Sequence, residues 1–246
     1  MKVDSITCYI QTLDNDSMFG FCHDAKIGAI DANHQVRYFS NSIDIPFNKY
    51  NVVVGSVEEC SKWLQYNNIT VPKSFDINNF VDFLGRRLYY NIPIKNINTF
   101  PVFIKPNSII KEFNGFVANN KWDLSFEIYH QNLDTDLLVQ SQEVIEIISE
   151  YRVYVNNNRI VGCKHYLGDC LTFPDKDIIQ KCFALSLKYI NSIAYTLDFG
   201  VLDSGQTVLI EINDGWALGN YGLDTSLYYQ LIKNRWLQII RENNNE

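Results

Sequence analysis

The segment YTLDFGVLDSGQTVLIEINDG, residues 195–215, predicts a β-hairpin. Its Asp-Ser-Gly turn at 203–205 tolerates tight or left-handed backbone, and apolar arms flank it. Because side chains alternate along a strand, we expect two faces on the second arm, one with Val208, Ile210 and Ile212, the other with Leu209, Glu211 and Asn213. Asp198 on the first arm then lies within reach of Glu211 and Asn213. By itself the pattern also fits a solvent-facing edge with ordinary polar residues.

Composition limits the possible classes of protein. The 246 residues are 46% hydrophobic and 20% charged, so the chain can bury a sizeable core. No apolar run could span a bilayer, and the N-terminal MKVDSITCYI lacks the apolar stretch of a secretory signal, so we expect a soluble, cytoplasmic protein with no membrane partner. The net charge is -7, and the largest basic cluster is Arg86-Arg87, which argues against general nucleic-acid binding. The six cysteines include no C-x-x-C pair, so we expect reduced, mostly buried thiols.

The order of predicted elements indicates an α+β protein with a cleft between its layers. Residues 1–88 form an α/β layer, in which a buried strand at 52–54 leads into a helix with a capping box at Ser56 and Glu59. From residue 89 we expect mainly strands, in the segments FPVFIKP (100–106), KWDLSFEIYH (121–130), DLLVQ (136–140) and EYRVYVNNNRIVGCKHY (150–166). An amphipathic helix starting near Pro174 precedes the hairpin, and another helix within 223–243 ends the chain.

Three basic residues lie on the predicted strands before the hairpin. Lys105 ends an apolar strand, Arg152 alternates with valines on another, and Lys164 lies on the returning arm of that second hairpin. Each of them alone is compatible with an ordinary surface cation. Together with two carboxylates and an amide they suit a nucleotide, because carboxylates that hold Mg²⁺ need cations nearby for the remaining phosphate charge.

Taken in order, these segments resemble the ATP-grasp superfamily, in its branch of RimK-like carboxylate–amine ligases. The likeness spans most of the chain, through VVVGSVE, FIKP, SEYRVYV, VGCKHY, LDFGV and EIND. The spacing D-x12-E-x-N of Asp198, Glu211 and Asn213 matches the family's magnesium-binding pattern. The resemblance implies an ATP-grasp fold, with an N-terminal α/β pre-grasp layer over 1–88 and an ATP-grasp domain over 89–246. The two lobes of that domain would enclose a nucleotide cleft, with a hinge near 142–146.

The resemblance also implies roles for individual residues. Lys105 would contact the inner phosphates of ATP, and Glu150 the ribose hydroxyls. In the hinge, Glu143, Val144 and Glu146 would lie where backbone groups read the adenine edge. Arg152 and Lys164 would be catalytic residues that also face phosphate or acyl-phosphate. Asp198, Glu211 and Asn213 would be the Mg²⁺ ligands.

The implied reaction joins a carboxylate to an amine, with ATP and Mg²⁺, through an acyl-phosphate intermediate. The acid and the amine could be small molecules, peptides or proteins. Two alternatives remain open: an ATP-dependent kinase on the same fold, or a nucleotide-binding or partner-binding module without turnover. The chain departs from the family's glycine-rich phosphate loop, since only Gly115 follows Lys105 closely, and Lys111 is a further candidate phosphate contact. Arg86 and Arg87 could add a cation at the cleft, or could complement a helix C-terminus.

Overall fold

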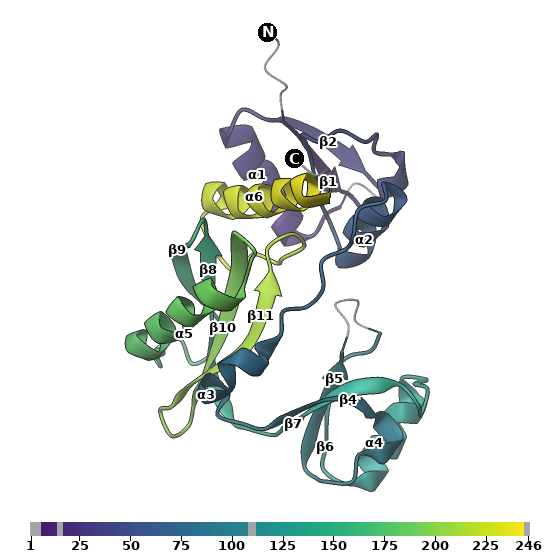
Figure 1. Cartoon of the computed structure of the whole chain (residues 1–246), viewed down its shortest axis with the longest axis vertical. Helices are drawn as coiled ribbons and strands as arrows, with labels where there is room; N and C mark the ends of the chain where they lie inside the picture. The colour runs from purple at the N-terminus through teal and green to yellow at the C-terminus, as the bar shows by residue number, and fades with distance from the viewer. Residues whose placement is uncertain (1–5, 14–16, 108–111, 244–246) are drawn as a thin grey trace.

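The computed structural model describes residues 6–13, 17–107 and 112–243. Within these ranges the strands form three sheets, which follow one another down the long axis of the molecule in Figure 1. Helices and strands are mixed throughout, so the prediction of an α+β protein is confirmed. Among the described helices, none has both the length and the hydropathy needed to cross a bilayer.

The first sheet is parallel, with strand order β2-β1-β3. Its elements are β1 (Thr7–Gln11), β2 (Gln35–Phe39), β3 (Asn51–Val54), α1 (Gly20–Asp31), α2 (Val57–Tyr66) and the C-terminal α6 (Thr225–Asn243). Helix α6, yellow in Figure 1, lies beside α1, and buried side chains of both helices belong to the same hydrophobic core. Gly28 permits this approach, because a Cβ there would collide with the carbonyl oxygen of Thr225. The last helix of the chain therefore completes the core of the first layer.

Helix α2 begins at the predicted cap. Ser56 Oγ accepts a hydrogen bond from the backbone N–H of Glu59 at 3.3 Å. The reciprocal half of the capping box is absent, because Glu59 instead accepts from the backbone N–H of Ser42 at 2.6 Å, and the backbone N–H of Ser56 donates to Gln11 at 2.6 Å. These bonds connect α2 to the end of β1 and to the short 3₁₀ helix η2 (Ser42–Asp44).

The second sheet is antiparallel, with strand order β11-β10-β8-β9. Its strands are β8 (Ile147–Asn156), β9 (Arg159–Gly168), β10 (Ala194–Leu202) and β11 (Thr207–Asp214). Both predicted hairpin turns are present, with positive φ angles of 50° and 59° at Asn157 and Asn158 and of 82° at Gly205. The helices η3 (Ile77–Phe80), α3 (Val81–Leu84) and α5 (Lys176–Tyr189) contribute to a second core on one face of this sheet.

The third sheet, with strand order β4-β7-β5-β6, forms the lobe at the lower right of Figure 1. Its elements are β4 (Leu88–Pro93), η4 (Ile94–Asn96), β5 (Val102–Pro106), β6 (Phe116–Ala118), α4 (Lys121–His130) and β7 (Leu138–Glu143). A separate hydrophobic core lies within this lobe. The chain therefore has three cores, as far as its described residues show.

The prediction of a strand over 121–130 was wrong, because this segment is helix α4. Asn120 caps the helix: its side chain accepts from the backbone N–H groups of Trp122 at 2.9 Å and Asp123 at 3.1 Å. Leu124 and Ile128, four residues apart, both pack on the third core, as the helical period requires. The aromatic content of the segment favoured a strand, but the cap and the helical spacing determine its structure.

Candidate functional site

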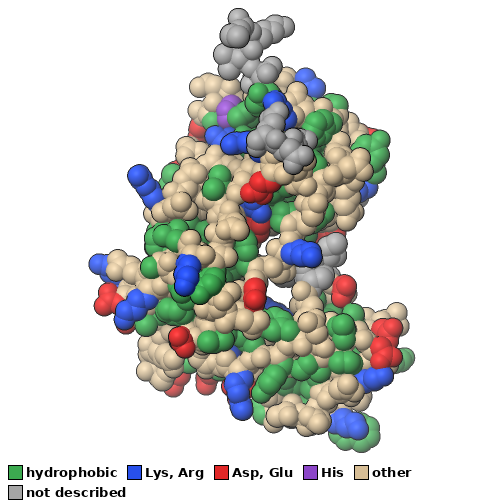
Figure 2. Space-filling model, in the orientation of Figure 1, with side chains coloured by type: hydrophobic (Ala, Val, Ile, Leu, Met, Phe, Trp, Pro, Cys, Tyr) green, Lys and Arg blue, Asp and Glu red, His purple; other side chains and the backbone are tan. Residues whose placement is uncertain are grey.

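A cleft of about 570 Å³ lies between the third sheet and the second. Figure 2 shows the surface hollowed between the lower lobe and the body above it. Strands β5 and β7 line the cleft from one side, and β8, β9, β11 and the loop after β11 line it from the other. Several predicted site residues lie in its wall, namely Lys105, Glu150, Arg152, Glu211 and Asn213.

The three predicted magnesium ligands are in contact with one another. The side-chain nitrogen of Asn213 donates to Asp198 Oδ2 at 3.2 Å and to Glu211 Oε1 at 2.9 Å. Glu211 also faces the opposite lobe, where Lys105 Nζ on β5 lies 3.5 Å from Glu211 Oε2. Residues from both lobes therefore meet at this end of the cleft.

A β-bulge sets the direction of these side chains and corrects the expected alternation on β11. The pairing of β10 with β11 shifts between Asp198, opposite Glu211, and Phe199, opposite Leu209, so that Ile210 is the extra residue. Leu209 is fully buried in the second core, whereas Glu211 lines the cleft, so the two do not share a face as predicted. Because of the bulge, two residues of β11 that are only two positions apart contribute one to the hydrophobic core and the other to the polar site.

Arg152 and Asp198 form a buried ion pair. The guanidinium donates from Nε to Asp198 Oδ1 at 2.8 Å and from Nη2 to Oδ2 at 2.6 Å, and Asp198 is 1% exposed. Burial raises the pKa of Asp198 to about 6, although Arg152 acts in the opposite direction. The third nitrogen of Arg152 donates to the carbonyl of Gly219 at 3.1 Å, and the ring of Tyr221 lies 4.4 Å from the guanidinium. Each guanidinium nitrogen therefore already has a partner within the protein.

Glu150 is held in the cleft by Tyr166, which sequence analysis did not identify. The hydroxyl of Tyr166 donates to Glu150 Oε2 at 2.6 Å, and its ring stacks on Tyr221 at 4.6 Å between centroids. Burial raises the pKa of Tyr166, so the hydroxyl keeps its proton and remains the donor. Because Tyr166 lies two residues after Lys164, regular alternation along the strand would place the two side chains on the same face. The pairing of β8 with β9 shifts between Glu150 and Tyr151, however, so the alternation is interrupted at this point.

Other predicted residues lie outside the lining of the cleft. Lys164 is half-buried on β9, opposite Arg152 on β8. Glu143 forms an ion pair with Arg87 and accepts from the Arg87 backbone N–H at 2.8 Å, while Val144 and Glu146 are exposed. Lys111 lies outside the described residues. The hinge near 142–146 and the role of Lys164 as a cation that faces phosphate therefore stay predictions.

The donor types at Asp198, Glu211 and Asn213 fit a magnesium ion. The candidate set consists of two carboxylates and one amide. It is therefore not a cluster of three His, Cys, Asp or Glu side chains, and the described ranges contain no such cluster. One oxygen of each carboxylate lies within hydrogen-bond distance of the same Asn213 nitrogen. Turning the amide by half a rotation would present its oxygen there, and Mg²⁺ prefers an all-oxygen set.

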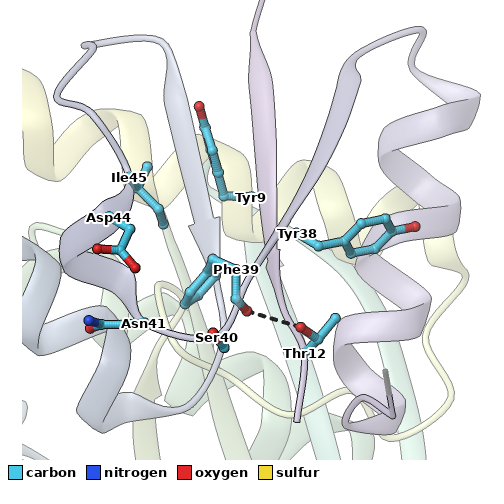
Figure 3. A pocket seen from close by; sticks show the side chains of 8 residues that line it. All are labelled: Tyr9, Thr12, Tyr38, Phe39, Ser40, Asn41, Asp44 and Ile45. Atoms are coloured by element: carbon cyan, nitrogen blue, oxygen red, sulfur yellow. Dashed lines mark hydrogen bonds between the residues drawn. The ribbon is translucent and has the colours of Figure 1, made fainter. Parts of the chain in front are cut away.

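A second hollow, of about 340 Å³, lies at the carboxyl ends of β1 and β2. Figure 3 shows Asp44 and Asn41 on one side of Phe39 and Thr12 on the other, next to the Phe39 carbonyl. Thr12 Oγ1 donates to the Phe39 carbonyl at 3.3 Å. The predicted site residues are not among those that line this hollow, so the chemistry proposed from the sequence concerns the cleft alone.

Comparison with known proteins identifies the family. A profile of the ATP-grasp domain of R2K clade family 2 matches residues 83–231, which is more than half of the chain. A search of curated proteins finds no match.

Solved structures share the fold at low sequence identity. A RimK domain ATP-grasp protein from Sphaerobacter thermophilus matches with a TM-score of 0.56 and 9% identity, over 95% of this chain and 99% of that one. N5-carboxyaminoimidazole synthetase from Staphylococcus aureus matches with a TM-score of 0.61 and 10% identity, over 94% of this chain and 77% of that one. D-alanine–D-alanine ligase from Bacillus anthracis matches with a TM-score of 0.55 and 12% identity, over 98% of this chain and 96% of that one. The predicted ATP-grasp fold and RimK-like resemblance are confirmed, and the chain belongs to the ATP-grasp family, in the R2K clade, family 2.

Proposed function

We propose that this protein is an ATP- and Mg²⁺-dependent ligase that joins a carboxylate to an amine through an acyl-phosphate. The observation that carries this proposal is the contact between the two lobes at Lys105 and Glu211, beside Asn213 and Asp198. Lys105, Glu211 and Asn213 line one cleft that is large enough for a nucleotide, and the buried Asp198 is bonded to Asn213. The family supports ATP as the nucleotide.

The residues of the cleft suit phosphoryl transfer, which needs alignment and charge neutralisation more than covalent help. Lys105 would hold a phosphate oxygen as a point charge, leaving its present partner Glu211. Glu211, Asp198 and Asn213 would hold Mg²⁺, which when bound neutralises phosphate charge. Arg152 would orient Asp198 through its two hydrogen bonds.

The identity of the substrates is proposed only as a class. The loop after β11 lines the cleft next to Asn213 with Trp216, Leu218 and Tyr221, so it is the candidate wall for the acceptor. Structural relatives include a ligase, PsnB, bound to a precursor peptide, and a synthase bound to ADP and an aminoimidazole ribonucleotide. Small molecules, peptides and proteins therefore all remain candidate substrates.

We propose the cytoplasm as the site of this activity. All six cysteines lie in the described part of the chain and are free thiols, four of them buried. Free thiols persist in a reducing compartment. The other two, Cys163 and Cys170, are exposed.

ADP release in the presence of acid and amine libraries tests the function. A ligase releases ADP and phosphate only when both an acid and an amine are present. ADP release with an acceptor alone, and a stable phosphorylated product, would show a kinase instead. Tight ADP binding without turnover under any pair would show a nucleotide-binding module. The Lys105→Ala protein, prepared in the same way, controls for contaminating ATPase.

A further inference from the structure

Arg86 is a basic residue in the wall of the cleft. It follows α3 and Gly85, whose left-handed φ of 61° turns the chain toward β11. Although it lines the cleft, each nitrogen of its guanidinium donates to the protein. Its bonds go to Gln142 Oε1 at 2.6 Å and to three backbone carbonyls, those of Leu84 at 3.0 Å, Leu209 at 2.9 Å and Ile210 at 2.8 Å.

Two of these carbonyls belong to the bulge on β11. Ile210 is the extra residue of that bulge, and an extra residue loses its regular partners in the ladder. The carbonyl of this residue, which is partly buried, then needs a donor elsewhere. The guanidinium of Arg86 supplies this donor. It is a planar group with several N–H donors, a geometry that a lysine ammonium does not reproduce.

The bulge in turn fixes the direction of the candidate metal ligands. In a regular strand Leu209, Glu211 and Asn213 would share one face. With the bulge, Leu209 enters the core while Glu211 stands opposite Asp198. The fourth bond, to Gln142 on β7, connects this arrangement to the opposite lobe at the first residue of the predicted hinge.

We propose that Arg86 is a positioning residue, which holds the β11 bulge and thereby directs Glu211 and Asn213 into the cleft. The expected effect of Arg86 on magnesium binding rests on the proposed function, whereas its effect on the β11 bulge does not. The bonds of Arg86 go to Gln142 and to backbone carbonyls, whereas its exposed neighbour Arg87 pairs with Glu143.

Two measurements on Arg86→Lys test the proposal. Amide hydrogen exchange over 208–213 should accelerate about tenfold in the nucleotide-free protein, because the bulge opens more often. In calorimetry, the strengthening of ADP binding by Mg²⁺ should fall about tenfold, while ADP affinity without Mg²⁺ stays close to wild type. Arg159→Lys makes the same change at the exposed first residue of β9 and should alter neither quantity.

Gln142→Met provides a second variant that keeps the bonds from Arg86 to β11. Its exchange over 208–213 should remain near the wild-type rate. Strong acceleration in this variant would contradict the proposal, because Arg86 would then act through β7. Wild-type exchange over 208–213 in Arg86→Lys would overturn it, as would faster exchange with an unchanged magnesium effect. If the wild-type protein binds no ADP, the proposed function fails, while amide exchange still determines whether Arg86 holds the bulge.

Discussion

Arg152 and Asp198 are paired opposite each other on β8 and β10, and both oxygens of the carboxylate accept from the guanidinium. The pair is almost fully buried, and its aromatic and backbone contacts reach the loop that follows β11. It therefore connects the candidate metal site to the candidate acceptor wall.

Breaking this pair from one side should destabilise the fold strongly. Arg152→Met leaves Asp198 buried without its partner, which typically costs about 3–5 kcal/mol of unfolding free energy. Urea denaturation measures the loss. Lys95→Met removes an exposed ion pair with Asp136 and should change stability little. A loss in Arg152→Met as small as that in Lys95→Met would show that the pair does not hold the sheet.

Lys105→Ala should weaken ATP binding without unfolding the protein. Lys105 is partly exposed at the end of β5, and its described ion pair with Glu211 is long at 3.5 Å. A charge-assisted contact to phosphate contributes about 1.5–3 kcal/mol, so affinity should fall about ten- to a hundredfold. Calorimetry on the folded variant measures this change. Unchanged affinity would remove Lys105 from the phosphate site.

Glu150→Ala should reduce the preference for ATP over its 2′-deoxy analogue, because Glu150 is the predicted partner of the ribose hydroxyls. The matched variant is Tyr166→Phe, which removes the 2.6 Å hydrogen bond but leaves the carboxylate in place. Competition binding with both nucleotides should show the preference kept in Tyr166→Phe and lost in Glu150→Ala. An equal preference in Glu150→Ala and wild type would contradict the assignment.

Local sequence signals predicted much of the fold. The Asn-rich and Asp-Ser-Gly turns need positive φ angles, and the residue types there supply them. The Ser56 cap and the alternating residues of β8 were readable for the same reason. Spacing along the hairpin also placed Asp198 near Glu211, although the metal role of these residues stays a prediction.

Features that depend on distant partners were not readable. The bulge at Ile210 is held by Arg86, which lies far away in the sequence, so alternation alone gave the wrong face for Leu209. Tyr166 acquires its role only because the folded hairpin brings its hydroxyl within hydrogen-bond distance of Glu150 on the neighbouring strand. Helix α4 was mistaken for a strand because its aromatic residues outweighed the Asn120 cap.

The central claim is that Glu211 belongs to a magnesium site, and Glu211→Gln tests it most directly. The variant keeps the size and shape of the side chain but removes its charge and replaces one acceptor oxygen with an amide donor. Asp203→Asn makes a comparable change in the exposed turn of the same hairpin and serves as the control. We measure thermal stability and Mg²⁺-dependent ADP formation for both variants. The account predicts two folded proteins, with turnover abolished only in Glu211→Gln, because phosphate charge is no longer neutralised during transfer. Full turnover with normal magnesium dependence in Glu211→Gln would contradict it.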